Sequence, residues 1–199
     1  MIRILTWLLA TALFAAMIHI AYVLFAPPYE MSRLIGQSIK TAGINNFSVL
    51  DADAQELILN ESSGTAVAGL CPFDLAQGSL VFDAALPDTI WSFAIYGDDG
   101  KDVYAINEAQ AGTNRFRLTI KRSSGLIQSL LGDNGDTGAA NDSWTTTMTS
   151  RRGLAIMWVA LDDRSLRNSY AETMKQSSCR IESEIGSQRP EIRNQKSEG

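Results

Sequence analysis

The chain begins with a long run of apolar residues in which polar residues do not recur at a regular spacing. Residues 4–26 form an uncharged run of 23 residues. As a helix rising about 1.5 Å per residue, this run would span roughly 30 Å of hydrocarbon. Trp7 lies near one end, and Tyr22 and Tyr29 lie near the other, as aromatic residues do at membrane interfaces. The pattern predicts a signal anchor, residues 1–28, that crosses the lipid bilayer once.

Two other interpretations of this run stay open. A cleaved signal peptide has an apolar core of about 7–15 residues and small residues at its cleavage site. Here the run is longer, and Leu24-Phe25-Ala26 leads into Pro27-Pro28. A buried core helix would have a flanking polar face, which this run lacks. His19, the one histidine of the chain, lies inside the run, where a place towards the membrane interface is expected.

The residues after the run change to helical spacing. Pro27-Pro28 is expected to end the first helix, because proline lacks the N–H that a helix interior needs. Gly43 then provides a C-terminal stop. Between them, apolar and small side chains recur on one helical face: Met31, Leu34, Ile35, Ser38 and Ile39. The spacing predicts a second, short amphipathic helix that packs on the domain or lies on the membrane surface.

The central part of the chain has the period of two that is typical of strands. Residues 80–84 and 91–95 alternate, and Gly97-Asp98-Asp99-Gly100 is a hairpin signal before a strand at 101–107. Residues 115–121 alternate between inward apolar and outward polar positions, and 144–149 form another expected strand. Residues 154–161 are apolar throughout, as in a central strand covered on both faces. Trp91 is expected in the core.

The end of the chain returns to a helical period. Asp162-Asp163 supplies an N-cap, and Leu166, Tyr170 and Met174 share one face of a helix that runs to about Gln176. From residue 181 the chain is polar, and we expect a disordered tail at 181–199. The prediction is therefore a mainly β, antiparallel β-sandwich-like domain at 29–180 with short flanking helices, preceded by one transmembrane helix.

The charge balance narrows the range of partners. Arg3 is the only charged residue in 1–26, so the remainder carries 16 basic and 22 acidic residues, a net charge of −6. An acidic domain with no long basic run is repelled by a phosphate backbone, which argues against nucleic acid. The same sign argues against electrostatic adhesion to anionic lipid. The sequence leaves the oligomeric state open.

The two cysteines bear on the compartment. Cys71 and Cys179 are 108 positions apart, with no C-x-x-C and no nearby histidine to complete a metal site. In an anchored chain this spacing favours an oxidising compartment and one structural disulfide, with two independent buried thiols as the alternative. Arg3 on one side of the run and Arg33 and Lys40 on the other leave the positive-inside rule undecided. The cysteines favour the inner membrane with the C-terminal domain in the periplasm.

Much active-site chemistry is excluded by composition. With no histidine beyond residue 19, the domain cannot hold a Ser-His-Asp triad, a Cys-His pair or a His-ligated zinc or haem. No phosphate-loop, dinucleotide-binding or H-E-x-x-H motif occurs. We therefore predict no cofactor and no metal ligand and assign no catalytic residue. Carboxylates, lysine, tyrosine or a serine activated by lysine remain for catalysis.

Two segments could still form a site. The loop at 132–143 holds Asp133, Asn134, Asp136 and Asp142, but from Asp133 the twelfth position is Trp144, so the calcium-loop register fails. Near the predicted hairpin, Tyr96, Tyr104 and Asn107 could line a polar pocket on a sheet face; strand aromatics also explain them. They are the candidate binding residues.

One block goes beyond generic β patterning. Residues 87–100 read P-D-x-x-W-S-x-x-x-Y-x-x-x-G, with Cys71-Pro72-Phe73-Asp74-Leu75 before them and Tyr104-Ala105-Ile106-Asn107 and Arg152-Gly153-Leu154 after. With the single N-terminal apolar run, residues 1–180 resemble the short, membrane-anchored bacterial form of the domain of unknown function 1254 family. The resemblance implies a bacterial cell-envelope protein with a β-sandwich-like domain, related to the domain of unknown function 1214. It implies no reaction and no catalytic residues.

Two classes of function remain. The leading one is a non-enzymatic envelope module that binds another envelope protein or a small ligand. The alternative is a periplasmic hydrolase or isomerase that uses carboxylates, with Asp88 or Asp99 as candidates because they flank the aromatic block. Two carboxylates in one concave pocket would favour the enzyme. A flat apolar patch of a few hundred Å² would favour protein binding.

Overall fold

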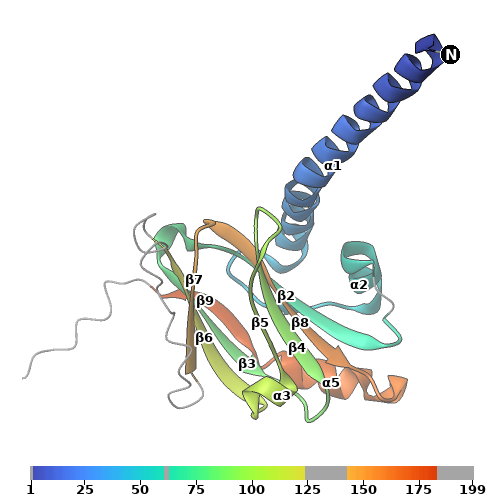
Figure 1. The fold of residues 1–199 in the computed structure, drawn as a ribbon. Helices are drawn as coiled ribbons and strands as arrows, with labels where there is room; N and C mark the ends of the chain where they lie inside the picture. The colour runs from blue at the N-terminus through green and yellow to red at the C-terminus, as the bar shows by residue number, and fades with distance from the viewer. Residues whose placement is uncertain (1, 61–62, 124–142, 183–199) are drawn as a thin grey trace, which may run out of the picture.

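Two packed β-sheets and one long helix make up the fold (Figure 1). The structure, a computed structural model, describes residues 2–60, 63–123 and 143–182. Within these residues nine strands form the two sheets. The predicted fold class, mainly β with short flanking helices after one apolar N-terminal helix, is confirmed. The acidic part of the loop at 132–143 and most of the tail at 181–199 lie outside the described residues.

The first sheet has five strands, and each neighbouring pair is antiparallel. Its order is β1 (Ser48–Val49), β2 (Ala66–Asp74), β8 (Arg152–Ala160), β4 (Trp91–Gly97) and β5 (Asp102–Asn107). The segment predicted as a central strand is indeed central, because β8 pairs with β2 on one side and with β4 on the other. The predicted hairpin joins β4 to β5, and Gly100 takes the positive φ of 80° that its turn needs.

The second sheet has four strands in the order β7 (Ser143–Met148), β6 (Arg115–Arg122), β3 (Ser79–Ala85) and β9 (Ser178–Glu182). Strand β3 pairs antiparallel with β6 and β9. The expectation of antiparallel pairing throughout is wrong for one pair, since β6 and β7 run parallel. A parallel pair needs a connection of about a dozen residues or more, and the chain between Arg122 and Ser143 is long enough to provide it.

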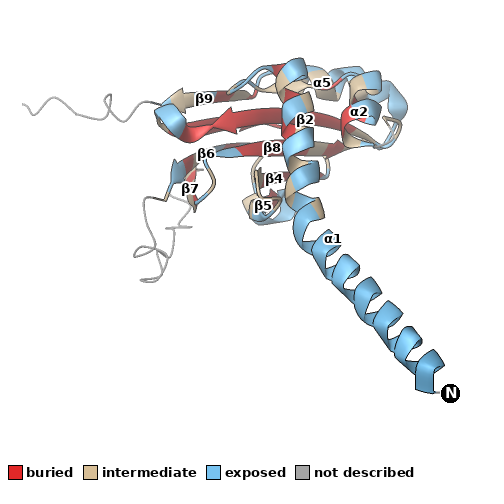
Figure 2. Ribbon diagram, turned by 90° about the horizontal axis from the view of Figure 1, so that it is seen from above, coloured by how far each residue is buried: buried red, intermediate tan, exposed pale blue. Residues whose placement is uncertain are grey.

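The main core lies between the two sheets. Figure 2 shows buried strands enclosed by exposed segments. Trp91, Phe93 and Ile95 point into this core, with at most 1% of their surface exposed, as the alternation in this strand predicted. A second apolar cluster lies on the opposite face of the five-stranded sheet, where Leu70, Leu154 and other sheet residues meet two helices.

The N-terminal helix is longer than predicted. Helix α1 (Ile2–Ala42) is continuous through Pro27 and Pro28, whereas the sequence predicted a break there and a separate second helix. Its first half is exposed on all sides, and it is long and apolar enough to cross a membrane. Its last turns bury Ile35 and Ser38 against the sheet. We attribute the continuity to this packing, which fixes the direction of the helix after the prolines and offsets their missing N–H groups.

The remaining helices are short. They are α2 (Ala52–Leu59), the 3₁₀ turns η1 (Leu75–Gln77) and η2 (Arg164–Leu166), α3 (Glu108–Ala111) and α5 (Arg167–Met174). The terminal helix was predicted: Asp163 accepts a hydrogen bond from the Ser165 N–H, and Met174 is buried. Helix α2 was not predicted, although Asp51 caps its first turn and Asn60 ends it in a left-handed conformation.

Three strands were also missed, the two-residue β1 among them. The second is β2, which contains Cys71, and the third is β9, from Ser178 to Glu182, which extends two residues into the predicted tail. Gly69 and Pro72 argue against a strand in the sequence. In the structure β1 pairs with β2 only at Gly69 and Leu70, so the Pro72 position has no strand on that side. A proline is tolerated there because no ladder hydrogen bond is lost.

Candidate functional site

A groove of about 530 Å³ lies where α1 reaches the domain. Both ribbon views place α1 between α2 and the β4–β5 strand pair (Figures 1 and 2). Helix α1 supplies six lining residues: Pro27, Glu30, Met31, Arg33, Leu34 and Gln37. Helix α2 supplies Leu57 and Ile58, its C-cap residue Asn60 also lines the groove, and Gly100 lies at the hairpin end. We call this depression the α1–α2 groove.

The wall formed by α2 is fixed by a buried glutamine. Gln55 is fully buried, its Nε2 donates to the Ala66 carbonyl at 3.1 Å, and its Oε1 accepts from the Ala68 N–H at 3.2 Å. Arg167 on α5 also donates to Gln55 Oε1, at 3.2 Å, and to the carbonyl oxygen of Leu50. These bonds tie α2 to the start of β2 and to the C-terminal helix. The side wall of the groove is therefore anchored to the sheet and to α5 through Gln55.

The opposite wall is α1. The buried face of this helix carries Ile35 and Ser38, and Met31 and Leu34 line the groove from beside them, where they pack against the second apolar cluster. Glu30 and Arg33 line the groove from the exposed side of the same turns. The hairpin closes against the helix at Gly100, where a Cβ atom would come 3.2 Å from the Pro27 carbonyl oxygen. Glycine at this position permits both the positive φ and the close approach.

The lining combines opposite charges with apolar side chains. Glu30 and Arg33 are both exposed, and neither forms an ion pair within the described residues. Leu57 leaves 79% of its surface exposed, although α2 buries Ile58 beside it. The lining set contains one carboxylate and no serine, cysteine, lysine or tyrosine. This arrangement suits the binding of a molecule with charged and apolar parts better than nucleophilic or acid–base catalysis.

The three residues proposed from the sequence do not form one pocket. Tyr96 on β4 packs on the helix side of the five-stranded sheet, while Tyr104 on β5 packs towards the core between the sheets. Burial raises the pKa of Tyr104 above its ordinary value. Asn107 is exposed and caps α3: its Oδ1 accepts from the Gln110 N–H, and Gln110 Oε1 accepts from the Asn107 N–H.

The two candidate catalytic carboxylates are also apart. Asp88 precedes β4 and accepts a hydrogen bond from Asn114, whereas Asp99 follows β4 and pairs with Lys101 at 3.2 Å. The seven residues of β4 lie between them, and a strand of that length spans roughly 20 Å. They do not share one concave pocket. Among the described residues no group of three or more His, Cys, Asp or Glu could hold a metal ion.

One ion cluster, missed from the sequence, fastens the end of β2 to the start of β8. Asp74 accepts from Arg151 Nε at 2.8 Å and from Arg152 Nε at 3.1 Å, and it caps η1 through the Ala76 N–H. The bonds from Arg151 lower the pKa of the Asp74 carboxyl most, and Arg152 and the Ala76 N–H lower it further, against burial, which raises it. The signal that could have found the cluster is the Arg-Arg pair opening the apolar strand.

A second cluster lies on the outer face of the four-stranded sheet. Asp83 on β3 pairs with Arg117 on the neighbouring β6 and with Arg180 on β9. Burial raises the pKa of Asp83, but the hydrogen bonds from the two arginines outweigh it, and the pKa lies below its ordinary value. All partners of this aspartate are cross-strand neighbours, so the cluster stabilises sheet pairing.

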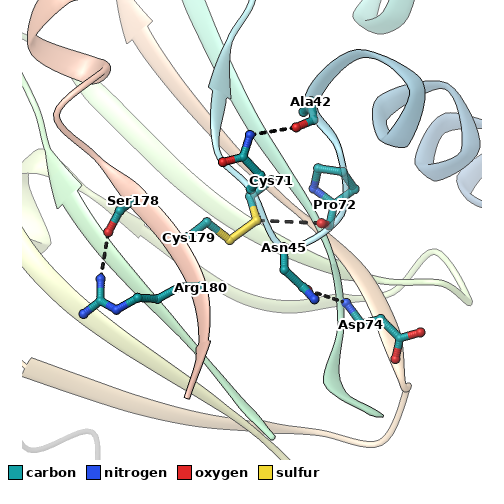
Figure 3. Close-up of a disulfide and its surroundings, with 9 residues drawn as sticks. Ala42, Asn45, Cys71, Pro72, Asp74, Ser178, Cys179 and Arg180 are labelled. Atoms are coloured by element: carbon teal, nitrogen blue, oxygen red, sulfur yellow. Dashed lines mark hydrogen bonds between the residues drawn. A yellow bond between two sulfur atoms is a disulfide. The ribbon is translucent and has the colours of Figure 1, made fainter. Parts of the chain in front are cut away.

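The predicted disulfide is present and links the two sheets. Cys71 on β2 is bonded to Cys179 on β9, with the Cα atoms 6.5 Å apart (Figure 3). On the same stretch of β2, Asn45 Oδ1 accepts from the Asp74 N–H at 2.9 Å. The bond therefore holds an edge strand of one sheet to an inner strand of the other. It lies in the core, away from the groove lining.

Comparison with known proteins gives a fold relationship. No family model matches the chain. The comparison with curated proteins also gives no match. The VPA0106 protein from Vibrio parahaemolyticus is similar in structure, with a TM-score of 0.53 and 12% identity, over 79% of this chain and 36% of that chain. An uncharacterized protein from Burkholderia cenocepacia gives a TM-score of 0.44 and 13% identity, over 72% of this chain and 38% of that chain. The chain thus spans little more than a third of either protein, and the first likeness shows a shared fold.

Proposed function

We propose that this protein is a single-pass, membrane-anchored binding module of the bacterial cell envelope, with α1 in the inner membrane and the β-sandwich in the periplasm. The observation that carries the proposal is the α1–α2 groove, which lies directly after the apolar part of α1. A partly apolar groove beside a membrane helix suits recognition of a membrane-associated molecule. The module acts by binding, not by catalysis.

The disulfide supports the proposed compartment. A bond that closes a sequence separation of 108 residues persists in the periplasm but is rare where cytosolic reductants act. It supports an outward-facing domain where the positive-inside rule is balanced. The bacterial origin rests on the resemblance of residues 87–100 to the domain of unknown function 1254 family.

A photoreactive residue in the groove tests the proposal. We would replace Leu57 with a benzophenone amino acid in the full-length protein and irradiate intact cell envelopes. The matched control is the same replacement of Ile90, an equally apolar residue, 67% exposed, that precedes β4 at the end away from Gly100. We expect an adduct at position 57 that is absent at position 90. Equal labelling at both positions, or none at either, contradicts a binding groove.

A carboxylate-dependent hydrolase or isomerase would be a second candidate function only if two carboxylates lay close together in one pocket. Asp88 and Asp99 lie at opposite ends of β4, and Asp99 is paired with Lys101. We therefore expect Asp88→Asn and Asp99→Asn to leave adduct formation at position 57 unchanged. A loss of labelling in either variant, with the fold intact, would favour a role for these carboxylates.

A further inference from the structure

We propose that the α1–α2 groove holds the headgroup of a zwitterionic phospholipid with a primary ammonium, of the phosphatidylethanolamine class. This inference rests on the proposed binding function and names its ligand. Four observations carry it: the depth of the groove relative to the apolar run, the pair of opposite charges, the direction of the α1 side chains, and the exposed leucine.

The groove begins where the hydrocarbon ends. The apolar run stops at Ala26, and the first lining residue is Pro27. Because α1 continues as a helix, Glu30 and Arg33 lie about 6 Å and about 10 Å further along its axis. Each headgroup layer of a bilayer is roughly 5–8 Å thick. Glu30 therefore lies within the headgroup layer, and Arg33 lies at its outer boundary.

The side chains of α1 lean back towards the bilayer. Helical side chains tilt towards the helix N-terminus, which here is the membrane end. A long arginine side chain at the boundary can therefore reach down to the phosphates, as snorkelling residues do. Neither Arg33 nor Glu30 has an ion-pair partner within the part of the chain that the structure describes. Both charges are available to a ligand.

The opposite charges of Glu30 and Arg33 favour one class of phospholipid headgroup. A guanidinium pairs with a phosphate through directed hydrogen bonds. A carboxylate three residues earlier accepts hydrogen bonds from a primary ammonium, which a quaternary ammonium cannot donate. Since Glu30 and Arg33 cancel, and the chain after residue 26 carries a net charge of −6, an anionic headgroup gains no net attraction. A zwitterionic, hydrogen-bonding headgroup matches both groups.

The apolar part of the lining accounts for the rest of the lipid. Leu57 is 79% exposed, and Met31, Leu34 and Ile58 line the groove with it. Leu57 lines the groove on α2, and its exposed side chain gains free energy when apolar lipid groups cover it, because its apolar surface then leaves water. The groove would thus hold the charged headgroup between Glu30 and Arg33, with the upper acyl carbons against Leu57.

Lipid retention by the full-length protein tests the assignment. The protein would be reconstituted in bilayer discs that contain equal parts of phosphatidylethanolamine, phosphatidylcholine and phosphatidylglycerol. After release from the discs, native mass spectrometry would measure which lipids stay bound to the protein. We expect retained phosphatidylethanolamine in excess over the other two. Arg33→Gln and Glu30→Gln should each lower its retention about three- to tenfold. Arg122→Gln, which removes the same charge from an exposed position on β6, should leave retention unchanged.

Three results would overturn the assignment. They are equal retention of phosphatidylcholine, preferential retention of phosphatidylglycerol, and unchanged retention in both groove variants with the wild-type circular dichroism spectrum. A protein adduct at position 57 without lipid selectivity would also overturn it, yet would leave the proposed binding function standing. Absence of both the adduct and the lipid would contradict the two proposals together.

Discussion

Trp91 lies at the centre of the aromatic residues that fill the space between the sheets. Its ring stacks on Phe116 with the centroids 5.5 Å apart, and its Nε1 donates to Asn114 Oδ1 at 3.4 Å. Phe116 in turn contacts Phe93 and Trp144 edge-on. One residue of β4 therefore connects both sheets through ring contacts. This position was predictable, because the alternation of Trp91 and Phe93 with polar or small neighbours marks the buried face.

Removal of this ring should destabilise the domain strongly. Trp91→Ala leaves a cavity at a position that is 1% exposed, and we expect a loss of about 3–5 kcal/mol in the free energy of unfolding. A denaturant titration in detergent measures it. Ser92→Ala, on the exposed face of the same strand, is the control and should change stability by less than about 0.5 kcal/mol. A loss below about 1 kcal/mol for Trp91→Ala would show that this face is not core.

The contribution of Asp74 to the stability of the domain should depend on pH. Because its pKa is lowered in the folded state, its contribution is present above the unfolded pKa of about 3.9 and is lost as pH falls through the folded value. Asp74→Asn should cost about 1–3 kcal/mol at pH 7, and the difference from the native protein should shrink below about pH 4. Thermal melts across pH measure it, with Asp102→Asn, on the exposed start of β5, as control. A difference that does not change with pH would contradict the ion cluster.

Some helices and strands could be predicted from their own sequence, whereas others form only because of their partners in the folded protein. Strands β4 and β6 could be predicted, because alternation along each strand records which face is buried. Strand β2 could not, because its Gly69 and Pro72 oppose strand formation and only pairing with β8 along its length compensates. Strand β9 carries few apolar residues, and its pairing with β3 and its disulfide hold it in place.

The α1–α2 groove was missed for the same reason. Its walls come from the second half of α1, from α2 and from a hairpin tip, which only tertiary packing brings together. The available signal was local: Asp51 and Asn60 bracket an eight-residue helix as N-cap and C-cap. By contrast, Tyr96 and Tyr104 were grouped because they lie near one hairpin. A bulge next to Tyr96 and the alternation of side chains place them on opposite faces.

The packing of α1 on the sheet can be tested at Ser38. Its hydroxyl is fully buried and has no hydrogen-bond partner among the described residues. Ser38→Ala removes an unsatisfied polar group, so stability should stay the same or rise by up to about 1 kcal/mol. Ser32→Ala, exposed on the same helix, is the control for helix propensity. If Ser38→Ala lowered the free energy of unfolding by more than about 1 kcal/mol, this contact between α1 and the sheet would be wrong.

At the scale of the whole molecule, three features lie along one axis. The exposed apolar half of α1 comes first, then the groove, and then the sandwich with its two sheets joined by the disulfide. An apolar helix that no part of the described domain covers is expected to be in lipid. The proposed function therefore requires the sandwich to lie on the periplasmic side of the membrane, and the redox state of the two cysteines reports that side.

The most direct measurement is a non-reducing mass map of the protein from intact envelopes, alkylated before lysis. If the domain lies outside the cytoplasm, a linked pair of peptides containing Cys71 and Cys179 should appear, and neither cysteine should be alkylated. Reduction should release both peptides. Two free thiols, each alkylated only after the membrane is opened and the protein unfolded, would contradict the disulfide and the periplasmic location together.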